Sequence, residues 1–430
     1  MAEKNEYLRV VDNRLKIAGL DVAETAQKFG TPVYLYNMER VVENYRVIKA
    51  AFLNEGIKAR IHYAMKANSN PEILKALSRE GAFIDAVSPN EAELALLCGF
   101  HKNKILFTGT SASNDDLQRI SEMGIETNID SLSQLKRLAK INPSNKKISI
   151  RINPDVGAGL HEHTITAGKF VKFGIIEEKA MEAVKLATGL GFKINGIHEH
   201  IGSGWLGEDV KDFLQTVEKI IEIAEKIEAF TGQQLEFMDF GGGPGIPYSP
   251  GQREFPMQEY AAGIAEAMKK SKLKAEVAIE PGRYIVGDAG IMVCKINTVE
   301  DKHIAVIGVD AGFNCLVRPA FYGAYHEIIV CENAGGKETK EYMVAGNLCE
   351  SGDVFTENRE ILRKLPIAEE GQHIAILNAG AYGFTMASNY NLRPRPGEVI
   401  VKKGSAFLSR DSEKLADMVS KTKELEASAD

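Results

Sequence analysis

Short apolar runs alternate with helix-like segments along much of this chain. From about residue 60 to residue 280, runs rich in β-branched and aromatic residues are separated by stretches in which apolar positions recur every three or four residues. This alternation is typical of parallel strands joined by helical crossovers. The candidate strands end near Lys66, Val87, Thr108, Asp130, Ile152, His200, Phe240 and Glu280. Eight strands within about 220 residues predict a (β/α)8 barrel.

The pattern changes after Gly287, where strand-like runs follow one another with few helical segments between them. Three such runs are residues 304–307, 327–330 and 374–377. A mostly β domain is therefore predicted to follow the barrel. A final stretch, about residues 411–426, is charged on most sides and is predicted to form a solvated helix.

These patterns predict an α/β chain with two domains. Residues 1–33 are expected to join the β domain, residues 34–285 to form the barrel, and residues 286–430 to form the β domain with its C-terminal helix. An apolar run at residues 32–36 would make a ninth strand, and we assign it to the junction between the domains.

Composition and charge exclude several classes of protein. The chain has 430 residues, of which 44% are hydrophobic and 26% charged, as in ordinary folded domains. A net charge of -7 gives no broad basic surface for nucleic acid, and no run approaches the ~18 apolar residues of a membrane span. The start of the sequence is charged and lacks the apolar core of a signal peptide. The five cysteines are odd in number and include no C-x-x-C pair, which favours reduced thiols. We expect a cytoplasmic protein that acts on small molecules and binds neither nucleic acid nor membrane.

Lys66 is the first candidate for chemistry. Active sites of (β/α)8 barrels form at the C-terminal ends of the strands, and Lys66 ends the first predicted strand. Its small neighbours, Ala64 and Ala67, leave room for a bulky group. A lysine partly removed from water has a lowered pKa, and its free amine can form an imine with a carbonyl group. The alternative is an ordinary surface lysine.

Two histidines end the sixth predicted strand. His198 and His200 are two residues apart, so a strand would place both on one face. One interpretation is a zinc site, which would need a third ligand such as His161 or His163 from a loop. The other is a cofactor site in which the imidazole of His200 lies on an aromatic ring. We favour the cofactor and expect no metal.

The last two strand ends offer groups suited to an anion and to a ring nitrogen. Gly241, Gly242 and Gly243 let backbone N–H groups approach a phosphate, although glycine turns are also common structural features. Glu280 beside a pyridine nitrogen would keep that nitrogen protonated, so that the ring could accept electrons. Arg283 could bind a carboxylate or a phosphate. The alternative for Glu280 and Arg283 is a simple surface ion pair.

Polar clusters interleaved with glycine also occur in the predicted β domain, at residues 310–314, 318–322, 349–353 and 381–383. By spacing alone each could be a turn. Together with the barrel motifs, they resemble the pyridoxal 5′-phosphate (PLP)-dependent decarboxylases built on the alanine-racemase type of barrel, most closely the diaminopimelate decarboxylases. The resemblance extends from about Ala18 to Phe407. It is most specific at residues 63–68, 200–203, 280–283, 318–320 and 349–353.

The resemblance implies a role for each candidate residue. Lys66 would carry PLP as an imine, His200 would stack on the ring, and Glu280 would meet the pyridine nitrogen. The other implied cofactor contacts are Asp85, Ser203, Gly242, Gly243, Gly282, Arg283 and Tyr382.

The implied substrate contacts are Arg283, Arg318, Tyr322, Glu350 and Tyr382. Arg283, Arg318 and Tyr322 would hold carboxylates, and Glu350 the distal ammonium group. Cys349 would reprotonate the carbanion. In the family, Cys349 and Glu350 reach the neighbouring subunit's site, so the resemblance also implies a homodimer with shared active sites.

The implied reaction is decarboxylation of meso-2,6-diaminopimelate to L-lysine and CO2, the last step of lysine biosynthesis. Three departures from the family pattern, at Glu199, Pro244 and residues 161–169, bear on the substrate and not on the cofactor. The alternatives are a decarboxylase of ornithine, arginine or carboxynorspermidine, an amino-acid racemase, or a non-catalytic PLP-binding regulatory protein. Residues 349–351 match the decarboxylases and argue against a racemase, and Lys66 and Cys349 argue against a non-catalytic protein.

Overall fold

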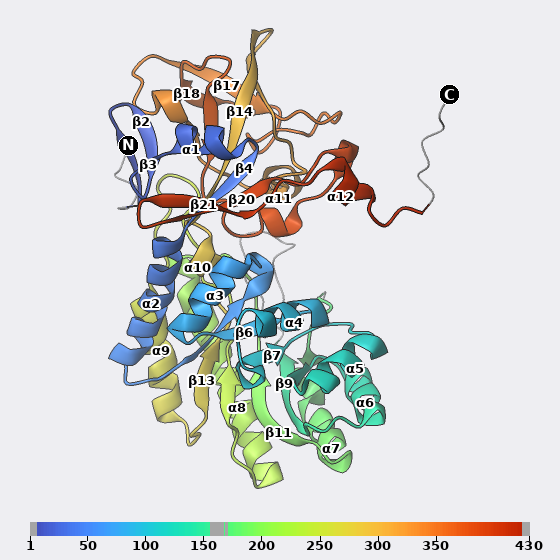
Figure 1. Ribbon diagram of the computed structural model, residues 1–430. Helices are drawn as coiled ribbons and strands as arrows, with labels where there is room; N and C mark the ends of the chain where they lie inside the picture. Colours follow the sequence, from blue (N-terminus) through green and yellow to red (C-terminus); the bar gives the residue numbers. More distant parts are fainter. Residues whose placement is uncertain (1–6, 155–166, 168–170, 424–430) are drawn as a thin grey trace. The chain divides into compact units, whose positions relative to one another are not determined.

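The computed structural model describes residues 7–154, 167 and 171–423. The chain divides into two compact units (Figure 1). One unit combines Met1–Arg40 with Asp288–Asp430, and the other is Val41–Gly287. We call them the β unit and the barrel unit.

Eight parallel strands close into a ring in the barrel unit. They are β5 (Arg60–Ala64), β6 (Phe83–Ala86), β7 (Ile105–Phe107), β8 (Glu126–Ile129), β9 (Lys147–Asn153), β11 (Lys193–His198), β12 (Phe237–Asp239) and β13 (Glu276–Ile279). Each pairs with the next, and β13 pairs with β5 to complete the ring. The predicted barrel is confirmed. The two-residue strand β10 (Ile175–Ile176), which pairs with β9, was not predicted.

Helices surround these strands (Figure 1). They are α2 (Met38–Asn54), α3 (Pro71–Glu80), α4 (Pro89–Leu97), α5 (Asn114–Met123), α6 (Leu132–Ile141), α7 (Ala180–Gly189), α8 (Val210–Thr231), α9 (Met257–Lys270) and the short α10 (Arg283–Val286). Helix α3 shows why they form: the Asn70 side chain caps its first turn, Pro71 begins it, and Gly81 ends it in a left-handed conformation. Its Ile73, Leu74 and Leu77 share one face and are buried. Among the described residues, no helix is both long and apolar enough to cross a membrane.

One layer of the barrel interior is apolar. Leu106, Phe237 and Ala278, from three strands, form a small buried cluster. Toward the C-terminal ends of the barrel strands, buried positions are polar: Asp85 on β6, Asn128 on β8, Asp239 on β12 and Glu280 just after β13 are at most 3% exposed. Buried polar groups need partners, so this region is where chemistry is expected.

The β unit contains most of the remaining strands. They are β1 (Leu8–Val11), β2 (Arg14–Ile17), β3 (Leu20–Asp21), β4 (Val33–Asn37), β14 (Gly290–Asp301), β15 (Ala305–Val309), β16 (Ile328–Val330), β17 (Thr339–Ala345), β18 (Arg363–Pro366), β19 (His373–Ile376), β20 (Gly397–Lys402) and β21 (Ser405–Arg410). Its helices are α1 (Val22–Phe29), α11 (Arg318–Tyr322) and α12 (Leu415–Val419). The first three strands form a small sheet, and the main sheet has the order β18-β17-β15-β14-β4-β20-β21. The predicted mostly β domain is confirmed.

The expected domain boundary at residue 34 is wrong by one strand. β4 pairs with β14 and β20, so it belongs to the sheet of the β unit. Val33 and Leu35 on one face of β4 join a buried cluster with Ile291 and Val293. The barrel unit therefore begins at Val41 and ends at Gly287.

The predicted helix at residues 411–426 is also wrong in length. Residues 424–426 of that prediction lie outside the described residues, and up to residue 423 helix α12 covers only Leu415–Val419 and has no buried residue. A sequence charged on most sides offers no apolar face to pack, and helices are marginal without packing.

Candidate active site

Lys66 lies just beyond β5, in the 3-10 turn Met65–Ala67. Its Nζ contacts a carboxylate oxygen of Asp85, and the Lys66 side chain is 33% exposed while that of Asp85 is 0% exposed. The hydroxyl of Thr108 donates a hydrogen bond to the other Asp85 oxygen. The surface-lysine interpretation is therefore wrong, because a buried acid holds the amine at the barrel's C-terminal end.

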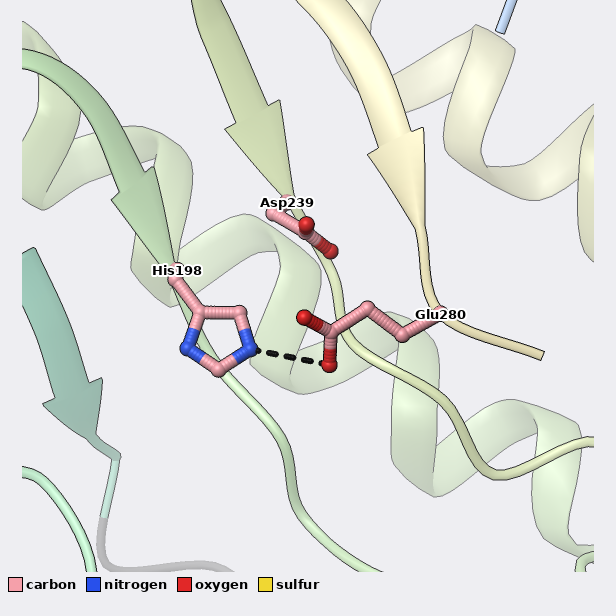
Figure 2. A group of neighbouring side chains, drawn as sticks. All are labelled: His198, Asp239 and Glu280. Atoms are coloured by element: carbon pink, nitrogen blue, oxygen red, sulfur yellow. Dashed lines mark hydrogen bonds and ion pairs between the residues drawn. The ribbon is translucent and has the colours of Figure 1, made fainter. Parts of the chain in front are cut away.

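Three further side chains meet at the ends of β11, β12 and β13 (Figure 2). His198 Nε2 lies 3.2 Å from Glu280 Oε2. Asp239 lies beside them, and its Oδ1 accepts a hydrogen bond of 2.9 Å from the Gly241 backbone. One ligand-type atom from each of the three lies within 4.8 Å of the others. These three groups have the composition either of a metal site or of a hydrogen-bonded network.

The two carboxyl groups of this cluster have opposite protonation preferences. Burial, together with the nearby Glu280 charge, raises the pKa of Asp239 well above its usual value. Burial alone would raise the pKa of Glu280 as well, but His198 and Lys66 outweigh it and lower that pKa. At neutral pH the pair therefore carries one negative charge, located on Glu280.

His200 and Ser203 follow β11. Burial lowers the pKa of His200 well below its usual value, and the cationic Arg151 and Lys66 lower it further. The ring is therefore neutral at physiological pH. Arg283, which is 5% exposed, donates from Nη2 to Ser203 Oγ over 3.2 Å and from Nη1 to the Tyr248 hydroxyl over 2.9 Å. The surface ion pair between Glu280 and Arg283 is therefore ruled out, because both side chains are buried.

The glycines at the rim allow close packing of the protein on itself. A Cβ at Gly242 would lie 2.5 Å from the Glu280 carbonyl oxygen, and one at Gly243, which has a φ of +129°, 2.6 Å from the Trp205 ring. At Gly282 a Cβ would lie 3.0 Å from the Ala64 carbonyl oxygen. Close packing alone therefore explains why these positions are glycine, without a bound phosphate.

In the β unit, Arg318 is fixed by a buried relay. Its Nε donates to His326 Nε2 over 3.2 Å, and His326 Nδ1 lies 2.7 Å from the Leu377 carbonyl oxygen. The Arg318 guanidinium also lies 5.8 Å from the centre of the Tyr322 ring. Arg318 is 5% exposed, so its orientation is set by these contacts.

The loop that carries Cys349 and Glu350 is organised by Asp353. Its carboxylate accepts hydrogen bonds from the backbone of Phe313 and Leu348 at 2.7 and 2.8 Å. The Cys349 backbone donates to Asn391 Oδ1 over 2.7 Å, and the Cys349 and Glu350 side chains are exposed. Tyr382 has a left-handed backbone, with a φ of +55°.

Sequence reasoning missed several site residues. His161 and His163 lie outside the described residues, so the alternative zinc ligands are not placed. The missed residues are Thr108, Asn128, Ser149, Arg151, Asp239 and Tyr248, all within the barrel unit. Most occupy every second position near the end of a barrel strand, and polar residues at such alternating positions were the available signal.

Comparisons with known proteins agree on one family. The model for "Pyridoxal-dependent decarboxylase, pyridoxal binding domain" matches residues 38–287. A curated diaminopimelate decarboxylase from Methanothermobacter thermautotrophicus is 45% identical over 94% of this chain and 94% of its own length. One from Archaeoglobus fulgidus is 37% identical over 95% of this chain and 97% of its own. The crystal structure of the M. jannaschii diaminopimelate decarboxylase in complex with L-lysine has a TM-score of 0.89 and 33% identity, covering 97% of this chain and 98% of that one.

Proposed function

Because the chain belongs to the pyridoxal-dependent decarboxylases, and within them to the diaminopimelate decarboxylases, we propose that it converts meso-2,6-diaminopimelate to L-lysine and CO2. It is a carboxy-lyase that uses PLP and acts on an amino acid. The cofactor comes from the family model that matches the barrel unit, and the substrate from relatives that match nearly the whole chain.

One observation in the site supports this function above the others. Lys66, whose amine is held by Asp85, and Glu280 lie at the same end of the barrel. The charge of Lys66 helps to lower the pKa of Glu280, so the carboxylate is ionised. Oε1 of Glu280 is buried and has no hydrogen-bond partner among the described residues. A protonated pyridine nitrogen would satisfy that oxygen, so the residues present fit PLP.

Different residues of the barrel unit would hold different parts of the cofactor. When bound, PLP supplies a conjugated ring that accepts the electron pair left by the departing CO2. Lys66 would provide the amine that holds the cofactor and that later releases the product. Glu280 would keep the ring nitrogen protonated, and the neutral imidazole of His200 would pack against the ring. Ser203 and Arg283, joined by their hydrogen bond, would bind the phosphate together with the backbone of the glycine loop.

The β unit would recognise the substrate. Arg318, fixed by His326, and the neighbouring Tyr322 would hold the distal carboxylate, and Glu350 the distal ammonium. Cys349 would protonate the α-carbon after CO2 leaves. Because ornithine and arginine lack a second carboxylate, the Arg318 and Tyr322 pair favours diaminopimelate.

We further infer a homodimer in which Cys349 and Glu350 of one chain complete the site of the other. Both side chains are exposed, as residues that serve a neighbouring subunit would be in an isolated chain. We also infer a reducing compartment, the cytoplasm, because all five cysteines are free.

Product analysis tests the proposed reaction. The PLP-loaded protein is incubated separately with meso-diaminopimelate, L-ornithine, D-ornithine and L-arginine. We expect equal amounts of L-lysine and CO2 from the first and no product from the others. Formation of putrescine or agmatine instead would keep Lys66 and the barrel chemistry but reassign Arg318, Tyr322 and Glu350.

A further inference from the structure

A chain of four buried side chains crosses the barrel interior and ends on Glu280. Ser149 Oγ lies 2.8 Å from Asn128 Oδ1, and Asn128 Nδ2 lies 3.0 Å from His198 Nδ1. His198 Nε2 then lies 3.2 Å from Glu280 Oε2 (Figure 2). None of the four is more than 3% exposed. Their hydrogen bonds must therefore be consistent with one another, because water does not reach them.

The orientation of the Asn128 amide sets the direction of each hydrogen bond. The Ser149 hydroxyl donates to the amide oxygen of Asn128, so the amide nitrogen faces the imidazole. An amide nitrogen only donates, so His198 Nδ1 must accept. In a neutral imidazole the single ring hydrogen then lies on Nε2, which donates it to Glu280.

This direction separates a hydrogen-bonded network from a metal site. A metal ion among His198, Asp239 and Glu280 would need the lone pair of His198 Nε2. The contacts with Asn128 and Ser149 leave a hydrogen on that nitrogen instead. The neighbouring Asp239 does not compete for the role of Glu280, because burial keeps its carboxyl group neutral.

We propose that His198 is a positioning residue: Ser149 and Asn128 fix it as the neutral Nε2–H tautomer, and its single donated hydrogen bond orients the ionised carboxylate of Glu280 toward the ring nitrogen of PLP. This inference rests on the proposed function for the identity of the ring. It gives His198 a role of its own, separate from the stacking proposed for His200. Glu280 Oε2 is occupied by His198, and Oε1 is the oxygen left for the cofactor.

The tautomer is tested directly in the cofactor-free protein. Protein labelled with 15N-histidine is examined by NMR at pH 8, and the signal missing from His198→Gln is assigned to His198. We expect the pattern of a ring protonated at Nε2 and not at Nδ1. A ring that carries a hydrogen on Nδ1, with or without one on Nε2, would overturn the proposal. A stoichiometric metal ion, found by elemental analysis and lost in His198→Leu, would overturn it in favour of a metal site.

The positioning role is tested with two substitutions of different hydrogen-bonding capacity. His198→Leu removes the donor, and we expect PLP affinity and kcat each to fall about 10-fold or more with little change in KM. The absorbance of the bound cofactor should also change its pH dependence, because the ring nitrogen loses its oriented partner. His198→Gln keeps an N–H donor and should recover most of each loss. His373→Gln, which alters a buried histidine of the β unit, serves as the control and should leave all of these values unchanged.

The outcomes distinguish this inference from the proposed function. If wild-type protein and His198→Leu form lysine equally well, with the same cofactor spectrum, the positioning role is wrong and the function stands. If the tautomer and the spectral changes are as expected but no lysine forms, the role of His198 stands and the substrate is wrong. A fall in melting temperature without any spectral difference between the Leu and Gln variants would mean a merely structural role.

Discussion

Two buried glutamates of the barrel unit show that neighbouring groups determine whether a buried carboxyl group is charged. Burial raises the pKa of Glu280, but His198 and Lys66 lower it further, so Glu280 is ionised. Glu199 is 0% exposed, and its described hydrogen bond comes from the Thr216 hydroxyl at 3.2 Å. Burial raises the pKa of Glu199 to about 8, so it is mostly neutral at pH 7. The departure from the family pattern at this position is thus a protonated acid packed behind the site.

Replacing Glu199 with Gln should stabilise the protein in a pH-dependent way. The folded chain keeps this proton up to about pH 8, whereas the unfolded chain loses it near 4.5, so the free energy of unfolding falls as pH rises through this window. Glu199→Gln removes that loss and should be more stable by on the order of 3 kcal/mol at pH 7, and by little at pH 5. Thermal unfolding at both pH values measures the difference.

The control for this prediction is Glu222→Gln, which alters an exposed glutamate on α8. It should change stability by less than about 0.5 kcal/mol at either pH. A Glu199→Gln variant whose stability relative to wild type is the same at pH 5 and pH 7 would show that Glu199 does not titrate in this window.

For single residues, the sequence could identify candidate site residues but not which of them contact one another. Lys66, His200 and Glu280 end predicted strands and match a known family, and the structure gives Lys66 and Glu280 charged surroundings suited to those roles. The contact between Asn128 and His198 joins residues 70 apart in the sequence. It depends on β8, β9 and β11 being neighbours in a closed ring, which periodicity alone does not give.

Among the elements, β11 shows how tightly the barrel strands are matched. Gly196 on β11 is paired with Phe237 on β12, and a Cβ at Gly196 would lie 2.4 Å from the Phe237 ring. The Phe237 ring therefore occupies the space that a side chain at position 196 would fill. It also belongs to the apolar layer directly below the polar network.

Gly196→Ala should destabilise the barrel by about 1–3 kcal/mol, because the new methyl group forces the Phe237 ring to move. Gly189→Ala is the matched control, since a Cβ there has no neighbour within 4 Å. It should be neutral or slightly stabilising at the end of α7.

Chemical denaturation measures these changes, and a double variant identifies the cause. Phe237→Leu removes the clash, so Gly196→Ala should cost less in that background than in the wild type. Equal costs in both backgrounds would mean that the Phe237 ring is not the obstacle.

The sequence best predicted the elements that have a regular apolar periodicity and clear boundaries. All eight barrel strands were located, because each is a short apolar run between longer helical segments. β4 was assigned to the junction between the domains, because its pattern shows a buried strand but not which sheet it joins. Its partners β14 and β20 lie more than 250 residues further along the chain.

The whole molecule combines a barrel unit, which carries the proposed cofactor groups, with a β unit assembled from both ends of the chain. The length of the chain and the change in its hydrophobic pattern after Gly287 predicted two domains. The resemblance to a known family suggested what each domain does. The groups proposed to bind and protonate the substrate are in the β unit, and the amine proposed to hold the cofactor is in the barrel unit. Whether these groups come from one chain or two decides how the active site is built.

Heterodimers of two inactive variants answer that question. Lys66→Ala lacks the amine, and Cys349→Ala lacks the proposed proton donor, so each homodimer should have little activity. If Cys349 serves the partner's site, a heterodimer places both substitutions in one site and leaves the other intact, so about half of the wild-type activity returns. Co-expression with two different affinity tags, followed by purification on both, isolates the heterodimer for assay. If each chain instead completed its own site, both sites would be damaged, and the activity would not exceed that of the Cys349→Ala homodimer.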